Sequence, residues 1–73
     1  MTVKEALDNY SLSTFYPSKG DNINRVCWQI YQSLDEKLIA ILIEINVRFD
    51  WDYMKPGAEI KYLPIDVCNK IDL

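Results

Sequence analysis

The sequence predicts a small α+β domain in which two strands flank two consecutive helices. Two stretches, "LSTFY" and "EIKYL", are rich in strand-forming residues and lie far apart in the chain. Between them, apolar residues recur twice with the spacing of an α-helix. We therefore expect two thin layers, with both helices packed on one face of the paired strands.

Residues 1–14 are predicted to form either a short helix or an N-terminal arm. Thr2-Val3-Lys4-Glu5 has the pattern of a capping box for a helix that ends near Asn9. An arm is an equal alternative, because the first residues of a domain are commonly poorly ordered. The first strand is expected over residues 12–16, and Pro17 ends it or marks an edge strand.

The first long helix is expected to follow a turn at residues 18–20, with Asp21 or Asn22 as its N-cap. Its apolar residues form one continuous stripe. The stripe consists of Ile23, Val26, Cys27, Ile30 and Tyr31, with Arg25, Gln29 and Gln32 on the opposite side. Trp28 lies about 140° around the helix from Ile23, so it belongs to neither face.

A second helix is predicted from Ser33 to about Asn46. Ser33-Leu34-Asp35-Glu36 reads as a capping box, and Asn46 is expected to end the helix in a left-handed turn. The main apolar stripe consists of Leu38, Ile41, Leu42 and Ile45, and Ile39 with Ile43 forms a second ridge. A helix with this many apolar residues is expected to be buried on more than one side.

An aromatic loop over residues 47–55 is expected to lead into the second strand. It carries Phe49, Trp51 and Tyr53 at every second position. Pro56-Gly57 has the order of a type II turn, in which glycine takes a positive φ.

The second strand is expected over residues 59–63, where polar and apolar residues alternate, and Pro64 ends it. Residues 65–73 are predicted to be a C-terminal tail of mixed polarity.

Composition disfavours several classes of function. The net charge is −3, from 8 basic and 11 acidic residues, and the basic residues form no cluster that would bind nucleic acid. The longest apolar run, residues 38–43, is too short to cross a membrane. Residues 1–10 lack the apolar segment of a signal peptide. Without histidine or metal-ligand spacing, we expect no metal and no cofactor.

Cys27 and Cys68 allow either a disulfide or two reduced thiols, and the sequence favours the reduced thiols. A domain of this length hides only about 60% of the surface that its unfolded chain exposes. Such domains usually depend on a disulfide, a metal or a partner. A partner is therefore the leading candidate for additional stability.

The order of these segments resembles the LysM domain. That family shows an aromatic strand, Gly-Asp, a helix, a second helix closing on Asn, and then Pro-Gly, an aliphatic residue and Pro. The matching residues are Phe15, Gly20-Asp21, Ile23 with Val26, Leu42 with Asn46, Pro56-Gly57, Ile60 and Pro64. The resemblance covers residues 15–64. It implies a βααβ fold with an antiparallel sheet, a turn at Gly20 and a helix cap at Asp21.

A narrower resemblance is to tail protein X, the short LysM-like protein of contractile phage tails. It rests on "VCWQIY", followed by a short acidic linker and an aliphatic helix that ends in Asn. Two residues depart from that family. Pro17 replaces an aliphatic strand residue, so we expect a short first strand. Gln32 stands where glycine is usual, so the link between the helices is expected to differ.

We predict no enzymatic activity, because the sequence has no histidine base and no recognisable nucleophile motif. Asp50 and Asp52 flank Trp51, and paired carboxylates can act on glycosidic bonds. Two carboxylates on one loop, with none fixed across a cleft, are more typical of a solvated turn.

Two functions follow as expectations from the resemblance. The first is a structural assembly protein in the baseplate or hub of a contractile phage tail, or of a related injection machine. It would be made in the host cytoplasm, join the virion, and bind other tail proteins in a symmetric ring. The alternative is a single LysM module that binds the N-acetylglucosamine chains of peptidoglycan. Neither function involves nucleic acid or a membrane.

The resemblance also implies where a sugar would bind. In LysM domains the groove lies between the Gly-Asp loop and the loop after the second helix. The matching residues are Gly20, Asp21, Asn22 and Ile23, with residues 47–52 opposite. Phe49 and Trp51 could stack on sugar rings there.

Four aromatic residues do not all fit a core built from two helix stripes. They are Trp28, Phe49, Trp51 and Tyr53. As exposed residues they would be interface anchors, with the terminal segments docking on neighbouring subunits. The competing interpretation is that residues 1–14 and 65–73 fold back and cover them. The two interpretations are equal for Trp28, whereas for Trp51 we favour an interface.

Overall fold

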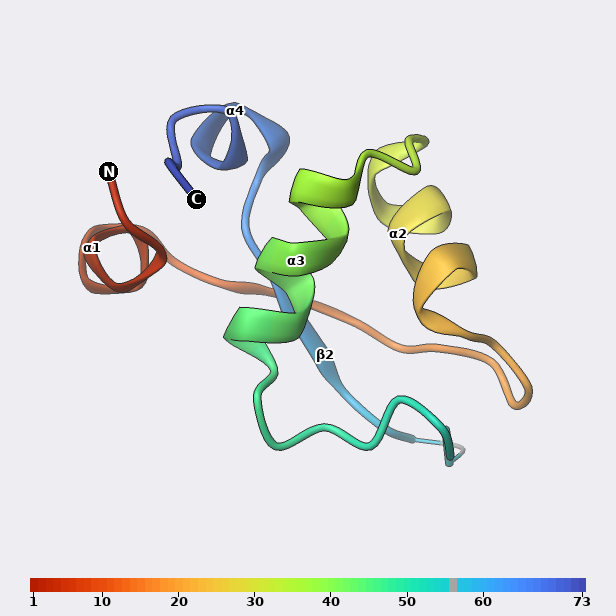
Figure 1. Ribbon diagram of the computed structural model, residues 1–73. Coiled ribbons are helices and arrows are strands. Elements are labelled where there is room, and N and C mark those ends of the chain that lie inside the picture. The colour runs from red at the N-terminus through yellow and green to blue at the C-terminus, as the bar shows by residue number, and fades with distance from the viewer. Residues whose placement is uncertain (56) are drawn as a thin grey trace.

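The computed structural model describes residues 1–55 and 57–73 and has the predicted α+β architecture. Its elements are α1 (Val3–Asn9), β1 (Ser13–Phe15), α2 (Ile23–Tyr31), α3 (Glu36–Ile45), β2 (Ile60–Tyr62) and α4 (Ile65–Cys68). The strand–helix–helix–strand order of the core is therefore confirmed, with one further helix on each side of it in sequence. Figure 1 shows α3 at the centre of the molecule, between α1 and α2 and in front of β2.

The two strands form an antiparallel sheet in which Ser13 pairs with Tyr62, Thr14 with Lys61 and Phe15 with Ile60. Phe15 and Ile60 belong to the core. On the opposite face, the Lys61 ammonium donates to the Thr14 hydroxyl at 2.6 Å. The first strand is shorter than the predicted segment, as expected when Pro17 follows it closely.

The turn before α2 uses Gly20 as the LysM resemblance implies, but the helix cap is a different residue. Gly20 makes the turn with a φ of +87°. The helix cap is Asn22, whose Oδ1 accepts from the Arg25 N–H at 2.9 Å, so the assignment of the cap to Asp21 is wrong. Asp21 instead accepts from the Ser18 N–H at 2.8 Å and closes the turn.

The capping box predicted for α3 is also wrong. The N-cap is Asp35, whose carboxylate accepts from the Lys37 N–H at 2.9 Å, and the Ser33 hydroxyl accepts from Asp35. The link between the helices turns at Gln32, which has a φ of +55°. Glycine adopts this left-handed conformation most easily, so glutamine costs more free energy there than glycine would.

Asn46 ties the end of α3 to the second strand. Its φ is −107°, so the predicted left-handed turn is wrong. Its side-chain amide donates to the carbonyls of Leu42 at 2.9 Å and Lys61 at 2.8 Å. Its Oδ1 accepts from the Lys61 N–H at 2.9 Å. The amide therefore satisfies both main-chain groups of Lys61, as a neighbouring strand would.

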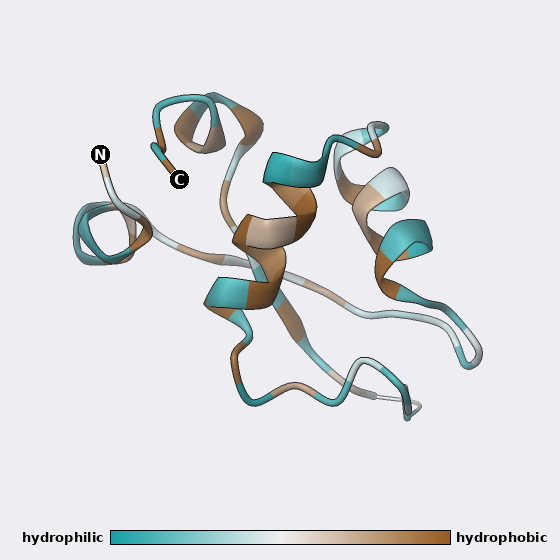
Figure 2. Ribbon diagram, viewed as in Figure 1, coloured by the Kyte–Doolittle hydropathy of each residue, from teal (hydrophilic) through white to brown (hydrophobic). Residues whose placement is uncertain are grey.

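The core is centred on α3, which packs against α1, α2 and β2. Its predicted inner stripe is buried at Leu38, Ile41 and Leu42. Ile43 is 46% exposed, so the prediction of burial on a second side is wrong at this residue. Figure 2 shows the concentration of apolar residues along α3 and β2.

Both ends of the chain pack into this core. The predicted capping box is present, because the Thr2 hydroxyl accepts from the Glu5 N–H and the Glu5 carboxylate accepts from the Thr2 N–H. Buried residues of the two ends are Val3, Ala6, Val67, Cys68 and Ile71. The Met1 ammonium donates to the Lys70 carbonyl at 2.9 Å, and the termini lie side by side (Figure 1). The prediction of a tail, and of end segments docking on neighbouring subunits, is therefore wrong for these buried residues.

The turn before β2 has glycine where a positive φ is needed. Gly57 has a φ of +84°, and the Ala58 N–H donates to the Lys55 carbonyl at 3.1 Å. The Pro56 half of the predicted type II turn lies outside the described residues. Apart from Gly57 and its neighbours in the chain, no described atom lies within 4 Å of the place where a Cβ at Gly57 would stand, so a substitution there chiefly strains the backbone.

Gly57→Val is expected to lower the free energy of unfolding by about 1 kcal/mol or more, because a β-branched residue resists a positive φ. Gly57→Asn is the control, since asparagine tolerates the left-handed conformation better. In thermal unfolding, wild type should have the highest melting temperature, Gly57→Asn an intermediate one and Gly57→Val the lowest. Equal melting temperatures for wild type and Gly57→Val would contradict this account of the turn.

Candidate binding site

A hollow lies where the resemblance places the LysM groove, between the turn after β1 and the loop after α3. Its volume is about 530 Å³. It is lined by Lys19, Gly20, Asp21, Asn22, Trp51, Asp52, Tyr53 and Met54. Five residues of the expected groove, Ile23 and residues 47–50, do not line this hollow, and of these Ile23 and Phe49 pack against the core. Met54 lines the hollow although sequence reasoning missed it, and its near-complete burial gives the loop a fixed point.

The aromatic loop is anchored by a tilted pair of rings rather than fully exposed. The ring centroids of Phe49 and Trp51 lie 4.8 Å apart at an interplanar angle of 58°. Both side chains are half-buried against the core, whereas Tyr53 is 66% exposed. The Trp51 indole nitrogen is buried and has no hydrogen-bond partner among the described residues. Trp51 therefore contributes to the fold as well as to the groove wall.

The carboxylates near this groove are used in turns. Asp21 is 8% exposed, and besides closing its own turn it forms an ion pair with the Arg25 Nε at 3.2 Å. The Asp50 carboxylate accepts from the Asp52 N–H at 3.0 Å, which is the hydrogen bond of an Asx turn. This arrangement matches the turn interpretation of Asp50 and Asp52.

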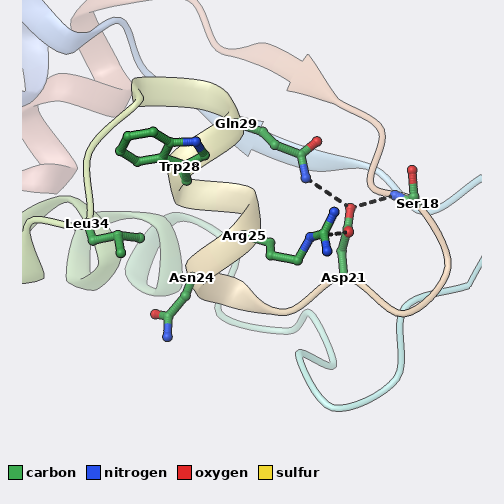
Figure 3. Close-up of a pocket in the computed structure, with 7 residues that line it drawn as sticks. All are labelled: Ser18, Asp21, Asn24, Arg25, Trp28, Gln29 and Leu34. Carbon is green, nitrogen blue, oxygen red and sulfur yellow. Dashed lines mark hydrogen bonds and ion pairs between the residues drawn. The ribbon is translucent and has the colours of Figure 1, made fainter.

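A second hollow lies along the outer side of α2, and Figure 3 shows the side chains that line it. Its volume is about 440 Å³, and its lining consists of Ser18, Asp21, Asn24, Arg25, Trp28, Gln29 and Leu34. Trp28 is 54% exposed and Leu34 is 56% exposed. The folded ends of the chain therefore leave much of Trp28 uncovered. Leu34 was not predicted as a site residue, and its only signal in the sequence is an apolar side chain within a polar linker.

Polar groups occupy the other end of the second hollow. Figure 3 shows the Asp21 carboxylate between Arg25, Gln29 and Ser18. The Gln29 amide lies 3.4 Å from it, which adds a weak hydrogen bond to the ion pair with Arg25. Because the charges of Asp21 and Arg25 offset each other, this hollow combines an apolar end with a polar end of no net charge.

Both cysteines are free and buried, in agreement with the favoured prediction of reduced thiols. The Cys27 thiol donates to the Ser33 carbonyl at 3.2 Å. Cys68 Sγ lies 3.5 Å from the Tyr31 hydroxyl, which donates to the Leu63 carbonyl at 2.7 Å. Burial raises the pKa of both thiols and of the Tyr31 hydroxyl. Thiols of this kind are poor nucleophiles near neutral pH, so their role is in packing.

The described part of the chain contains no group of three His, Cys, Asp or Glu side chains placed to hold a metal ion. Across residues 1–55 and 57–73, no helix has the length and apolar character needed to cross a membrane.

Comparisons with models of protein families, with curated proteins and with solved structures found no significant match. The resemblance to LysM domains and to tail protein X therefore rests on the order of the sequence motifs alone. Function has to be argued from that order and from the two hollows.

Proposed function

We propose that this protein is a structural assembly protein of a contractile phage tail or a related injection machine, and that it acts by binding neighbouring proteins. The observation that carries the proposal is the exposed Trp28 beside Leu34 on the outer side of α2. Tryptophan is enriched among the residues that dominate binding energy at protein interfaces. The tail setting, in the baseplate or hub, rests on the resemblance to tail protein X.

The surroundings of Trp28 support a protein partner. Interfaces commonly have an apolar centre and a polar rim in which charges are paired. Here Trp28 and Leu34 supply the apolar part, while Asn24 and Gln29 supply uncharged amides. A partner that covered Trp28 would also add burial to a domain whose own core is small.

Peptidoglycan binding is the second candidate, and the first hollow favours it. That hollow brings Gly20, Asp21 and Asn22 to face Trp51 and Tyr53, as in a LysM groove. The Trp51 ring lines this hollow, where it could stack on a sugar ring. We rank this function second because Trp51 packs partly against the core, whereas Trp28 is 54% exposed.

Two tryptophan variants separate these functions. Trp28→Ala is expected to weaken binding to the tail partner by about 2 kcal/mol, or about 30-fold, because the anchor is lost. Its stability should change by only about 1 kcal/mol, since more than half of the side chain is exposed. The matched control is Tyr53→Ala, an exposed aromatic residue that lines only the other hollow.

The measurement is co-sedimentation of purified wild type and variants, once with tail particles made without this protein and once with purified peptidoglycan. We expect wild type and Tyr53→Ala to sediment with the particles and Trp28→Ala to remain in solution. Sedimentation of wild type with peptidoglycan but not with particles, abolished by Trp51→Ala in a folded variant, would replace the assembly function with the second candidate.

A further inference from the structure

The two edges of the sheet differ in how their main-chain groups are satisfied. On β2, the N–H and the C=O of Lys61 both bond to the Asn46 side chain. In an extended strand the two main-chain groups of one residue point to the same side. Lys61 therefore points away from β1, and this edge of the sheet is closed by Asn46.

The opposite edge is open at Thr14. Thr14 lies opposite Lys61 in the antiparallel register. Because the main-chain groups of Lys61 point away from β1, this pair has no ladder hydrogen bonds. The main-chain groups of Thr14 therefore point away from β2. The 2.6 Å contact between their side chains agrees, because such pairs bring side chains closest together. Among hydrogen bonds outside the β1–β2 ladder, none in the described part of the chain involves the Thr14 N–H or C=O.

This open edge lacks the charges that usually protect edge strands. No charged side chain occurs in residues 9–18. Natural proteins commonly place lysine on such edges to prevent pairing with another chain. On the same face as Thr14 lie Leu12 and Tyr16, which are 40% and 64% exposed. The Tyr16 hydroxyl lies 3.4 Å from the Glu59 carboxylate, which places Tyr16 on that face.

We infer that β1 pairs with β1 of a second copy of this chain, antiparallel about a two-fold axis at Thr14. The two Thr14 residues would exchange both main-chain hydrogen bonds. In this register Leu12 of each copy lies opposite Tyr16 of the other, so two aliphatic–aromatic pairs flank the axis. The result is a four-stranded sheet with Asn46 closing both outer edges.

The self-complementary register favours a second copy over an unrelated extended peptide. In a two-fold dimer the same surface of each copy contacts the other. Here that contact sets no like charges opposite each other and pairs the apolar side chains of Leu12 and Tyr16. Because the contact is short, the dimer is weak and forms at high local concentration. It does not depend on the proposed role in a phage tail.

The test is sedimentation velocity over a range of protein concentrations on wild type and two double variants. Leu12→Lys with Tyr16→Lys sets like charges opposite each other twice and is expected to weaken dimerisation about tenfold. This variant changes the net charge only from −3 to −1, so general repulsion does not explain the loss. Leu12→Lys with Tyr16→Glu sets opposite charges in both pairs and should restore dimerisation.

Circular dichroism should show the same fold for wild type and both double variants, since both positions are exposed. A wild type that stays monomeric up to millimolar concentration would overturn the inference. Equal dimerisation of wild type and the Lys/Lys variant would place the dimer on another surface. Failure of the Lys/Glu variant to recover would overturn the antiparallel register.

Discussion

Leu42→Ala is expected to lower the free energy of unfolding by about 2–5 kcal/mol, because it removes a fully buried side chain and leaves a cavity. Domains are typically stable by only about 5–15 kcal/mol, and a short one lies near the lower limit. The variant should therefore be partly or wholly unfolded at room temperature, as measured by urea denaturation.

The matched control for Leu42→Ala is Ile43→Ala in the same helix. Ile43 is 46% exposed, so its truncation should cost less than about 1 kcal/mol. Similar losses for the two variants would mean that the faces of α3 are assigned incorrectly.

Asn46→Ala is expected to cost about 2–3 kcal/mol. The substitution leaves the N–H and C=O of Lys61 without their partner, and an unsatisfied group away from water costs about 1–3 kcal/mol. Asn46→Asp should also destabilise, because a carboxylate can accept from the Lys61 N–H but cannot donate to its carbonyl. Asn24→Ala, on the exposed side of α2, is the control and should be close to neutral.

Hydrogen exchange of the Lys61 amide reports on the same contact. The exchange should be slow in wild type and in Asn24→Ala. In Asn46→Ala it should accelerate by more than the loss of global stability alone explains. An unchanged exchange rate at Lys61 would show that Asn46 does not hold this edge of the sheet.

The sequence predicted the helices and strands because apolar spacing reflects burial directly. Val26, Cys27, Leu42 and Ile60 are buried as their periodicity requires. The caps were predicted less well. Asp35 rather than Ser33 caps α3. Both side chains can accept the capping hydrogen bond, and tertiary packing decides at which of them the helix begins.

The role of the C-terminal segment was missed for a different reason. Helix α4 has four residues, and a helix of that length is unstable in isolation. It forms because Val67, Cys68 and Ile71 pack against the core, and that long-range contact leaves no clear local signal.

The candidate site was predicted in part. The Gly20–Asp21 turn and the loop of Trp51 do meet in one hollow. Aromatic residues at every second position of a loop do not indicate which of them face the core. The packing of Trp51 on Phe49 was therefore not predicted. The position of Trp28 between the two faces of α2 left its exposure open, and in the folded chain it is 54% exposed.

The central claim is that the outer side of α2 faces a neighbouring protein. The direct measurement is site-specific photo-crosslinking in assembled particles, with the crosslinking amino acid at Asn24 on the rim beside Trp28. Lys4, exposed on α1, is the control position. We predict that position 24 crosslinks to one tail protein, identified by mass spectrometry, and that the crosslink disappears when Trp28→Ala is added. Particles that contain the protein but give no crosslink at position 24, or give the same crosslink with Trp28→Ala, would contradict the claim.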